Sequence, residues 1–168
     1  MEQNAIKKSL LSGLFILISA LAFSQSKLVD NKQTKILFEN IGQELFGPEP
    51  SDSICTLYST ITLQVRNHKL TEQVDFSRDL PQVFRDEFNK IVHLYREANW
   101  TKAIPAGGAN YDIYQPFVYY YFDTAACPDT ITGGQIKAKL KEDITKRAAK
   151  VQGYQLLPIK LRAYPVVH

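Results

Sequence analysis

The chain has few of the residues on which metal and redox chemistry depend. It contains only two cysteines, Cys55 and Cys127, and three histidines, His68, His93 and His168. Neither cysteine belongs to a CxxC pair and no HExxH motif occurs, which excludes the usual sequence patterns of zinc sites. We therefore expect no metal centre and no cofactor.

Motifs for nucleophilic catalysis and phosphate binding are also missing. No GxSxG is present, so the nucleophile elbow of serine hydrolases has no support. Two glycine pairs, at 107–108 and 133–134, stand outside any GxGxxG or GxxxxGK[ST] context. A cysteine and a histidine could still meet in space as a nucleophilic pair. From the missing motifs we predict a protein that is not an enzyme.

Charge of one sign is not concentrated anywhere. The formal net charge is +3, and no block of five like charges occurs. The lysines at 137, 139 and 141 are followed by Glu142 and Asp143. Interleaved signs of this kind indicate a solvated helix face, so we expect no nucleic-acid partner.

Only one long apolar run occurs, from Leu10 to Phe23, and it is shorter than the roughly 20 residues that span a bilayer. Lys7 and Lys8 precede it, and the small residues Ala22 and Ser24 end it. This order is typical of a secretory signal peptide cut after Ser24. The alternative is a retained membrane anchor.

Cleavage would divide the chain into a signal peptide (1–24), an N-terminal helix and linker (25–56) and a single domain (57–168). The protein would then be periplasmic or secreted, without a stable membrane anchor. In an exported chain, two cysteines suggest one disulfide, here between Cys55 and Cys127. Unpaired buried thiols or a reactive thiol remain the alternatives.

Hydrophobic periodicity predicts the elements. Apolar residues at helical spacing indicate a helix within 27–47, and alternation indicates strands at 57–66 and 70–76 around an Asn67-His68 turn. A helix follows at 80–97, with Ser77 or Asp79 as its cap. A strand at 112–122 contains Pro116, which predicts an edge position or a bulge. A further helix, which we expect Gly153 to stop, and a strand at 154–164 follow.

These elements predict an α+β fold. We expect an antiparallel sheet of three or four strands with the long helix on one face and the C-terminal helix over the other face or an edge. The predicted core comprises Leu63, Val65, Val74, Phe84, Phe88, Ile91, Val92 and Phe117, with Trp100 near its rim.

The segment from Tyr58 to Phe122 resembles the C-terminal domain of TonB and its small exported relatives in the Bacteroidetes. The hairpin at 61–74, the helix exit Trp100-Thr101-Lys102-Ala103 and the proline-containing strand at 114–119 carry the likeness. One departure is the hairpin turn, where His68 and Lys69 stand in place of the family's usual glycine. The resemblance implies the fold and strand-to-strand binding of a partner.

The only unusual cluster is a row of tyrosines, Tyr114, Tyr119, Tyr120 and Tyr121. A solvent-facing row could stack on sugars or grip a peptide, whereas burial under helices on both faces would explain it without a ligand. We predict an exported protein that binds an envelope protein or peptide through a sheet edge. The alternatives are a secreted enzyme acting on envelope glycans or peptides, and a small carbohydrate-binding module that uses the tyrosines.

Overall fold

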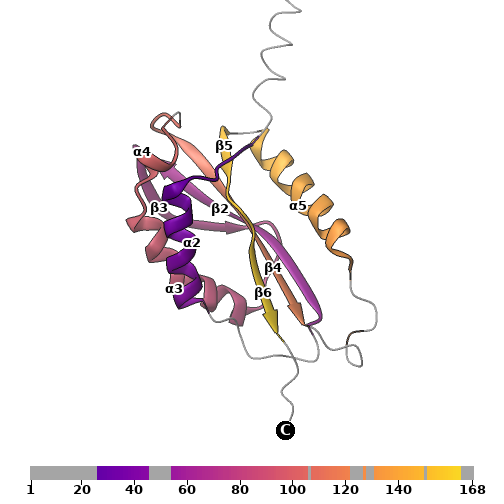
Figure 1. The fold of residues 1–168 in the computed structure, drawn as a ribbon. Helices are drawn as coiled ribbons and strands as arrows, with labels where there is room; N and C mark the ends of the chain where they lie inside the picture. Colours follow the sequence, from indigo (N-terminus) through magenta and orange to yellow (C-terminus); the bar gives the residue numbers. More distant parts are fainter. Residues whose placement is uncertain are drawn as a thin grey trace, which may run out of the picture.

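The computed structural model of the chain describes residues 26–45, 54–105, 107–121, 127, 131–149 and 151–163. The expected signal peptide, the linker at 47–50 and His168 lie outside these residues. The elements are, in chain order, β1 (Lys27–Leu28), α2 (Lys32–Glu44), β2 (Thr56–Arg66), β3 (Lys69–Phe76), α3 (Gln82–Glu97), α4 (Trp100–Ala103), β4 (Tyr111–Tyr121), α5 (Gly133–Ala148), β5 (Gly153–Gln155) and β6 (Ile159–Ala163) (Figure 1).

The fold is α+β, as the sequence predicts, but the sheet is mixed rather than antiparallel. Its strand order is β1-β5-β4-β2-β3, and β6 also pairs with β4. The pairs β2–β3 and β2–β4 are antiparallel, whereas β4–β5, β4–β6 and β1–β5 are parallel. The expected last strand is two short strands, because the chain leaves the ladder at 156–158.

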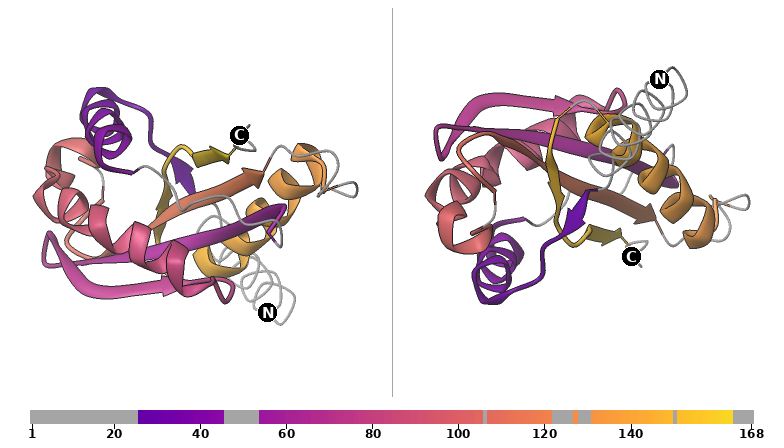
Figure 2. Two further views of the ribbon diagram at one scale, coloured as in Figure 1. Left: turned by 90° about the horizontal axis from the view of Figure 1, so that it is seen from below. Right: turned by 90° about the horizontal axis from the view of Figure 1, so that it is seen from above.

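Helices cover both faces of the sheet (Figure 2). On one face, α2, α3 and α4 pack with alternate residues of β2 and β4 in the main core. On the other face, α5 buries Ile136 and Leu140 against Tyr58 and Val118. All the residues predicted for the core lie in the main cluster, Val74 as a partly buried member, and Trp100 is itself buried.

The hairpin between β2 and β3 turns at Asn67 and His68, as predicted. Both residues have positive φ, 51° and 63°, the conformation of the tight turns that suit twisted strands. The turn also contacts the segment before β4, since the His68 N–H donates to the Ala109 carbonyl at 3.0 Å and the Asn67 N–H donates to Asn110 Oδ1 at 3.0 Å.

The edge or bulge predicted for Pro116 is wrong, because β4 lies between β2 on one side and β5 and β6 on the other. Pro116 is opposite Thr60, whose N–H and carbonyl bond Ser77 on the β3 side. The backbone of Pro116 therefore points away from β2, toward the break between β5 and β6. A central strand tolerates this proline because its missing N–H faces a gap in the ladder.

The predicted caps of the long helix are also wrong. Helix α3 begins at Gln82 with Pro81 in the cap position and no side-chain cap. Asp79 instead pairs with Arg85, whose Nε donates to the Leu80 carbonyl at 2.8 Å. The proline φ of −52° suits a helix entry, so the helix starts without the hydroxyl or carboxylate cap that we expected.

The expected disulfide between Cys55 and Cys127 is present, with a Cα–Cα distance of 5.4 Å. It joins the start of β2 to the chain beyond β4, where the Tyr121 N–H donates to the Cys55 carbonyl at 2.9 Å. The bond closes a separation of 72 residues, for which chain entropy suggests about 4 kcal/mol of stabilisation.

No helix in the described part is long and apolar enough to cross a bilayer.

Candidate functional site

The tyrosine row does not form a solvent-facing surface. Tyr114, Tyr119 and Tyr121 are buried, and Tyr120 is half-buried against the cluster under α5. Tyr119 and Tyr121 face the α3 side, where Phe84 packs edge-on to Tyr119 at 4.8 Å between ring centroids. The burial of both strand faces explains the aromatic sequence. Of the two interpretations of the tyrosine row, burial on both strand faces agrees with the structure, and the solvent-facing stacking surface does not.

A buried polar network joins β4 to α3 and to the segment between β5 and β6. Gln115 is completely buried, and its amide nitrogen donates to the Leu157 carbonyl at 2.7 Å and to the Pro116 carbonyl at 2.9 Å. The Tyr95 hydroxyl donates to Gln115 Oε1 at 3.0 Å. Burial raises the pKa of Tyr95 far above its ordinary value, so this hydroxyl stays a donor. The network holds the break after β5 in place.

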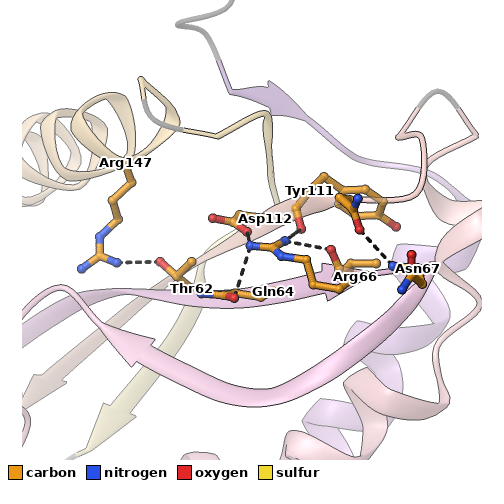
Figure 3. Close-up of polar contacts among 9 residues, drawn as sticks. Thr62, Gln64, Arg66, Asn67, Tyr111, Asp112 and Arg147 are labelled. Carbon is orange, nitrogen blue, oxygen red and sulfur yellow. Dashed lines mark hydrogen bonds and ion pairs between the residues drawn. The ribbon is translucent and has the colours of Figure 1, made fainter.

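A second polar group lies on the α5 face near the hairpin (Figure 3). The Arg66 guanidinium donates to Asp112 Oδ1 and to the Tyr111 carbonyl, both at 2.9 Å. Arg147 from α5 donates to Thr62 Oγ1 at 2.8 Å and pairs with the Asp75 carboxylate. These contacts cross from β2 to β4 and from α5 to the β2–β3 hairpin, so their role is to fix strand register and helix position.

The Tyr114 hydroxyl lies beside this polar group but takes no part in its hydrogen bonds. Its ring is packed against Ile144 and Ala148 of α5, and its oxygen has no hydrogen-bond partner among the described residues. Burial, followed by the Asp112 charge, raises the pKa of Tyr114 to about 12. A hydroxyl in this position is neutral at physiological pH and contributes no hydrogen bond within the described structure.

Neither His68 nor His93 lies in a cluster of metal-ligating side chains within the described part of the chain. His68 is exposed in the hairpin turn, and His93 is exposed on α3, where its Nε2 lies 3.4 Å from Glu44 Oε2. Within the residues that the structure describes, no three His, Cys, Asp or Glu side chains gather closely enough to hold a metal ion. Both cysteines are used in the disulfide, so neither is a thiol nucleophile while that bond is intact.

An open groove separates α5 from the last strands. We call it the α5 groove; its volume is about 1010 Å³. Its floor is the β4 residues Pro116, Val118 and Tyr120. One wall is α5, and the other comes from the N-terminal and C-terminal segments of the described chain. The lining residues are Ser26, Pro116, Val118, Tyr120, Gly133, Ile136, Lys137, Leu140, Lys141, Ile144, Thr145, Gln155, Pro158 and Lys160.

The ionisable lining of the α5 groove is of one sign. Lys137, Lys141 and Lys160 line it, and the described lining contains no carboxylate. None of the three forms an ion pair within the described residues, unlike Lys146 on the outer side of α5, which pairs with Glu142 at 2.6 Å. The α5 lysines at 137, 139 and 141 are all exposed, in agreement with the solvated helix face that their interleaved charges predict. Lys137 and Lys141 are four residues apart and directly follow the buried residues Ile136 and Leu140. This spacing indicates that both lysines lie on one side of the helix, at the rim of the groove.

Three strands lie at the borders of the sheet. Strand β3 ends the strand order on one side, with eight residues that pair only with β2. On the other side, the border consists of the short strands β1 and β6.

Comparison with protein-family models, with curated proteins and with solved structures finds no match to this chain.

Proposed function

We propose that this is an exported, non-catalytic protein that binds an extended segment of a partner polypeptide along strand β3. The central hairpin, helix and strand, β2 to β4, follow the order on which the resemblance to the TonB C-terminal domain rests. The Cys55–Cys127 disulfide is consistent with an oxidising compartment outside the cytoplasm. The apolar leader and the disulfide support export independently of each other.

The observation that carries the proposal is the unoccupied border of β3. The strand that the sequence marked as an edge, β4, is already paired on both sides by β2 and by β5 and β6. Strand β3 has no second neighbour among the described strands, and eight residues give room for a partner strand. An added strand would satisfy the outward backbone groups of β3 and gain its affinity from them.

The outward groups can be assigned to particular residues. Ser77 bonds Thr60 through its backbone N–H, so the backbone of Ser77 points toward β2. Because the direction alternates along a strand, Phe76 and Val74 present their N–H and carbonyl groups to the open side. The exposed side chains of Lys69 and Glu72 lie along the same strand, whereas the carboxylate of Asp75 is paired with Arg147. Such charges discourage unspecific strand pairing, so they would favour a partner with complementary charges.

The test combines crosslinking with a matched pair of variants. A photoreactive residue in place of the exposed Gln73, introduced into the full chain in its native host, should crosslink one defined partner. The same probe in place of Asn89, exposed on α3, should not. Val74→Pro removes one outward N–H and should abolish the crosslink. Val74→Ala truncates the side chain at the same position but keeps the N–H, and it should retain the crosslink.

The proposal fails if Val74→Pro retains the crosslink while its melting temperature matches that of Val74→Ala. It also fails if the probe at Asn89 captures the same partner as the probe at Gln73, because the contact would then not be specific to the β3 border.

A further inference from the structure

Strand β6 leaves a second border of the sheet open, because it pairs with β4 and has no other neighbour among the described strands. Its backbone directions follow from those of β4. The Tyr121 N–H donates to Cys55 on the β2 side, so by alternation the backbone of Tyr120 points toward β6. In a parallel pair Tyr120 bonds the two neighbours of Arg162, the residue aligned with it, which leaves the N–H and carbonyl of Arg162 on the open side. The backbone of Lys160, two residues earlier, points the same way.

The α5 face of β6 is positively charged. Side chains of aligned residues in neighbouring strands lie on the same face of a sheet. Lys160 is aligned with Val118 and Arg162 with Tyr120, and both β4 residues belong to the cluster under α5. The two cations are exposed, and neither forms an ion pair within the described residues. Each residue with outward backbone groups on β6 therefore also carries an uncompensated cation.

Positive charge continues from β6 to α5. Lys137 and Lys141 line the α5 groove together with Lys160, and the described lining contains no carboxylate. A negative group at the border of β6 would therefore meet cations from two elements of the fold.

The opposite face of β6 is apolar and incompletely covered. Leu161 and Ala163 point to the side of the main core, against which they are only partly buried. A strand added beside β6 would cover them further with every second side chain and place the remaining side chains on the α5 face. The two faces together select a strand in which apolar and negatively charged residues alternate.

The charge of β6 argues against a second copy of this chain as the partner. Pairing of two β6 strands would place Lys160 and Arg162 of one copy against the same cations of the other, and like charges in opposite positions are destabilising. Lysine in an edge strand also discourages unspecific pairing. Carboxylates in the same positions would form favourable cross-strand pairs.

We propose that β6 binds an extended segment of another polypeptide in which acidic residues alternate with apolar residues. The segment bonds the outward backbone groups of Lys160 and Arg162, its carboxylates lie beside the two cations, and its apolar side chains cover Leu161 and Ala163. The site lies on the opposite side of β4 from β3, so it does not depend on the strand pairing proposed above.

The first test measures binding of a fluorescent octapeptide of alternating valine and glutamate to the full chain by anisotropy. The double variant Lys160→Glu, Arg162→Glu should bind at least about tenfold more weakly, because two attractive cross-strand pairs become repulsive. The double variant Lys102→Glu, Lys139→Glu has the same net charge, but both residues are exposed outside the groove lining. At 0.15 M salt, where charges are screened beyond about 8 Å, the affinity of this control should change less than about twofold.

Equal weakening in the two double variants would reduce the interaction to unspecific charge attraction and overturn the proposal. Unchanged affinity in the β6 variant would place the peptide elsewhere, on β3 or on the apolar leader, and also overturns it. So does absence of binding to the unaltered chain. The β6 variant should still crosslink its partner from position 73, which separates this site from the one on β3.

A second test alters the peptide and leaves the protein unchanged, so it does not depend on the folding of a variant. One octapeptide carries N-methyl groups on its glutamates and another on its valines. Only alternate N–H groups of an added strand face β6, so one of the two peptides should lose at least about tenfold in affinity and the other should retain it. Equal affinities of the two would show that no strand pairing occurs.

Discussion

Two buried tyrosines show how differently the same hydroxyl can contribute in one molecule. The Tyr95 hydroxyl donates to Gln115 at 3.0 Å, and Gln115 has no solvent exposure. The Tyr114 hydroxyl is equally buried and has no partner among the described residues. A buried polar atom without a partner costs free energy, whereas a bonded one is close to neutral or favourable.

The pair Tyr95→Phe and Tyr114→Phe should therefore change stability in opposite directions. Tyr95→Phe leaves Gln115 Oε1 unsatisfied and should lower the free energy of unfolding by about 1–3 kcal/mol. Tyr114→Phe removes an unpaired hydroxyl and should leave that free energy unchanged or raise it by up to about 1 kcal/mol. Urea unfolding of the two variants beside the unaltered chain measures both values. A loss at Tyr114→Phe as large as that at Tyr95→Phe would contradict the assignment.

At the scale of elements, the alternation of apolar residues was enough to predict β2, β3, α3 and the helical stripe of α5. Each of these has one clearly apolar face, and a repeat of two or of three to four residues reports that face directly. The disulfide was predictable because its cysteines flank two strands that run side by side.

The mixed part of the sheet was not predictable from these patterns. Strand β5 has only three residues, too few for periodicity, and its parallel pairing with β4 depends on a contact far along the chain. The presence of Pro116 led to the prediction of an edge strand. No residue near it in the sequence indicates that its backbone faces the break between β5 and β6. The α5 groove arises from the separation of α5 and β6, which no local pattern encodes.

Strand β5 reaches β4 only because position 153 is glycine. A Cβ built on Gly153 would overlap the ring of Tyr114, which is itself fixed under α5. Gly153 was expected to stop the preceding helix, but α5 ends at Ala148 and Gly153 is the first residue of β5. The glycine is needed for close approach of the strand to the tyrosine.

Gly153→Ala should therefore destabilise the protein by about 1–3 kcal/mol through overpacking. Gly42→Ala is the matched control, because Gly42 lies in α2 with no atom within 4 Å of its added methyl group. That control should raise stability by about 0.5–1 kcal/mol, since alanine is the better helix former. Thermal unfolding of the two single variants measures the difference in sign, and a neutral Gly153→Ala would show that β5 can move away from Tyr114.

For the whole molecule, the many buried phenols predict a loss of stability in alkali. Burial raises the pKa of Tyr111, with a smaller contribution from Tyr154, to about 12, and the pKa of Tyr114 also to about 12. In the unfolded chain these groups ionise near pH 10. Between pH 10 and 12 the unfolded state therefore binds fewer protons than the folded state, and stability falls as the pH rises.

We expect the free energy of unfolding to fall by up to about 1.4 kcal/mol per pH unit for each of the two tyrosines. Below pH 9 their ionisation should change it little. Urea unfolding at pH 8, 10 and 11 without reductant measures it. The Tyr114→Phe variant serves as the control, because its slope should be shallower by the contribution of one phenol. An unchanged unfolding midpoint from pH 8 to 11 would show that these rings ionise as easily in the folded state as in the unfolded state.

The pairing of β1 with β5 has a consequence for how the protein is made. Lys27 and Leu28 pair with Tyr154 and Gln155. The first described strand can therefore form its ladder only after β5 is available. Under the export that we propose, in which the amino end emerges first, the β2–β3 hairpin can form early. Until residues 153–163 have emerged, one side of β4 and the whole of β1 lack their strand neighbours. A chaperone that protects this late-closing side should matter more for the yield of the protein than one that acts on the hairpin.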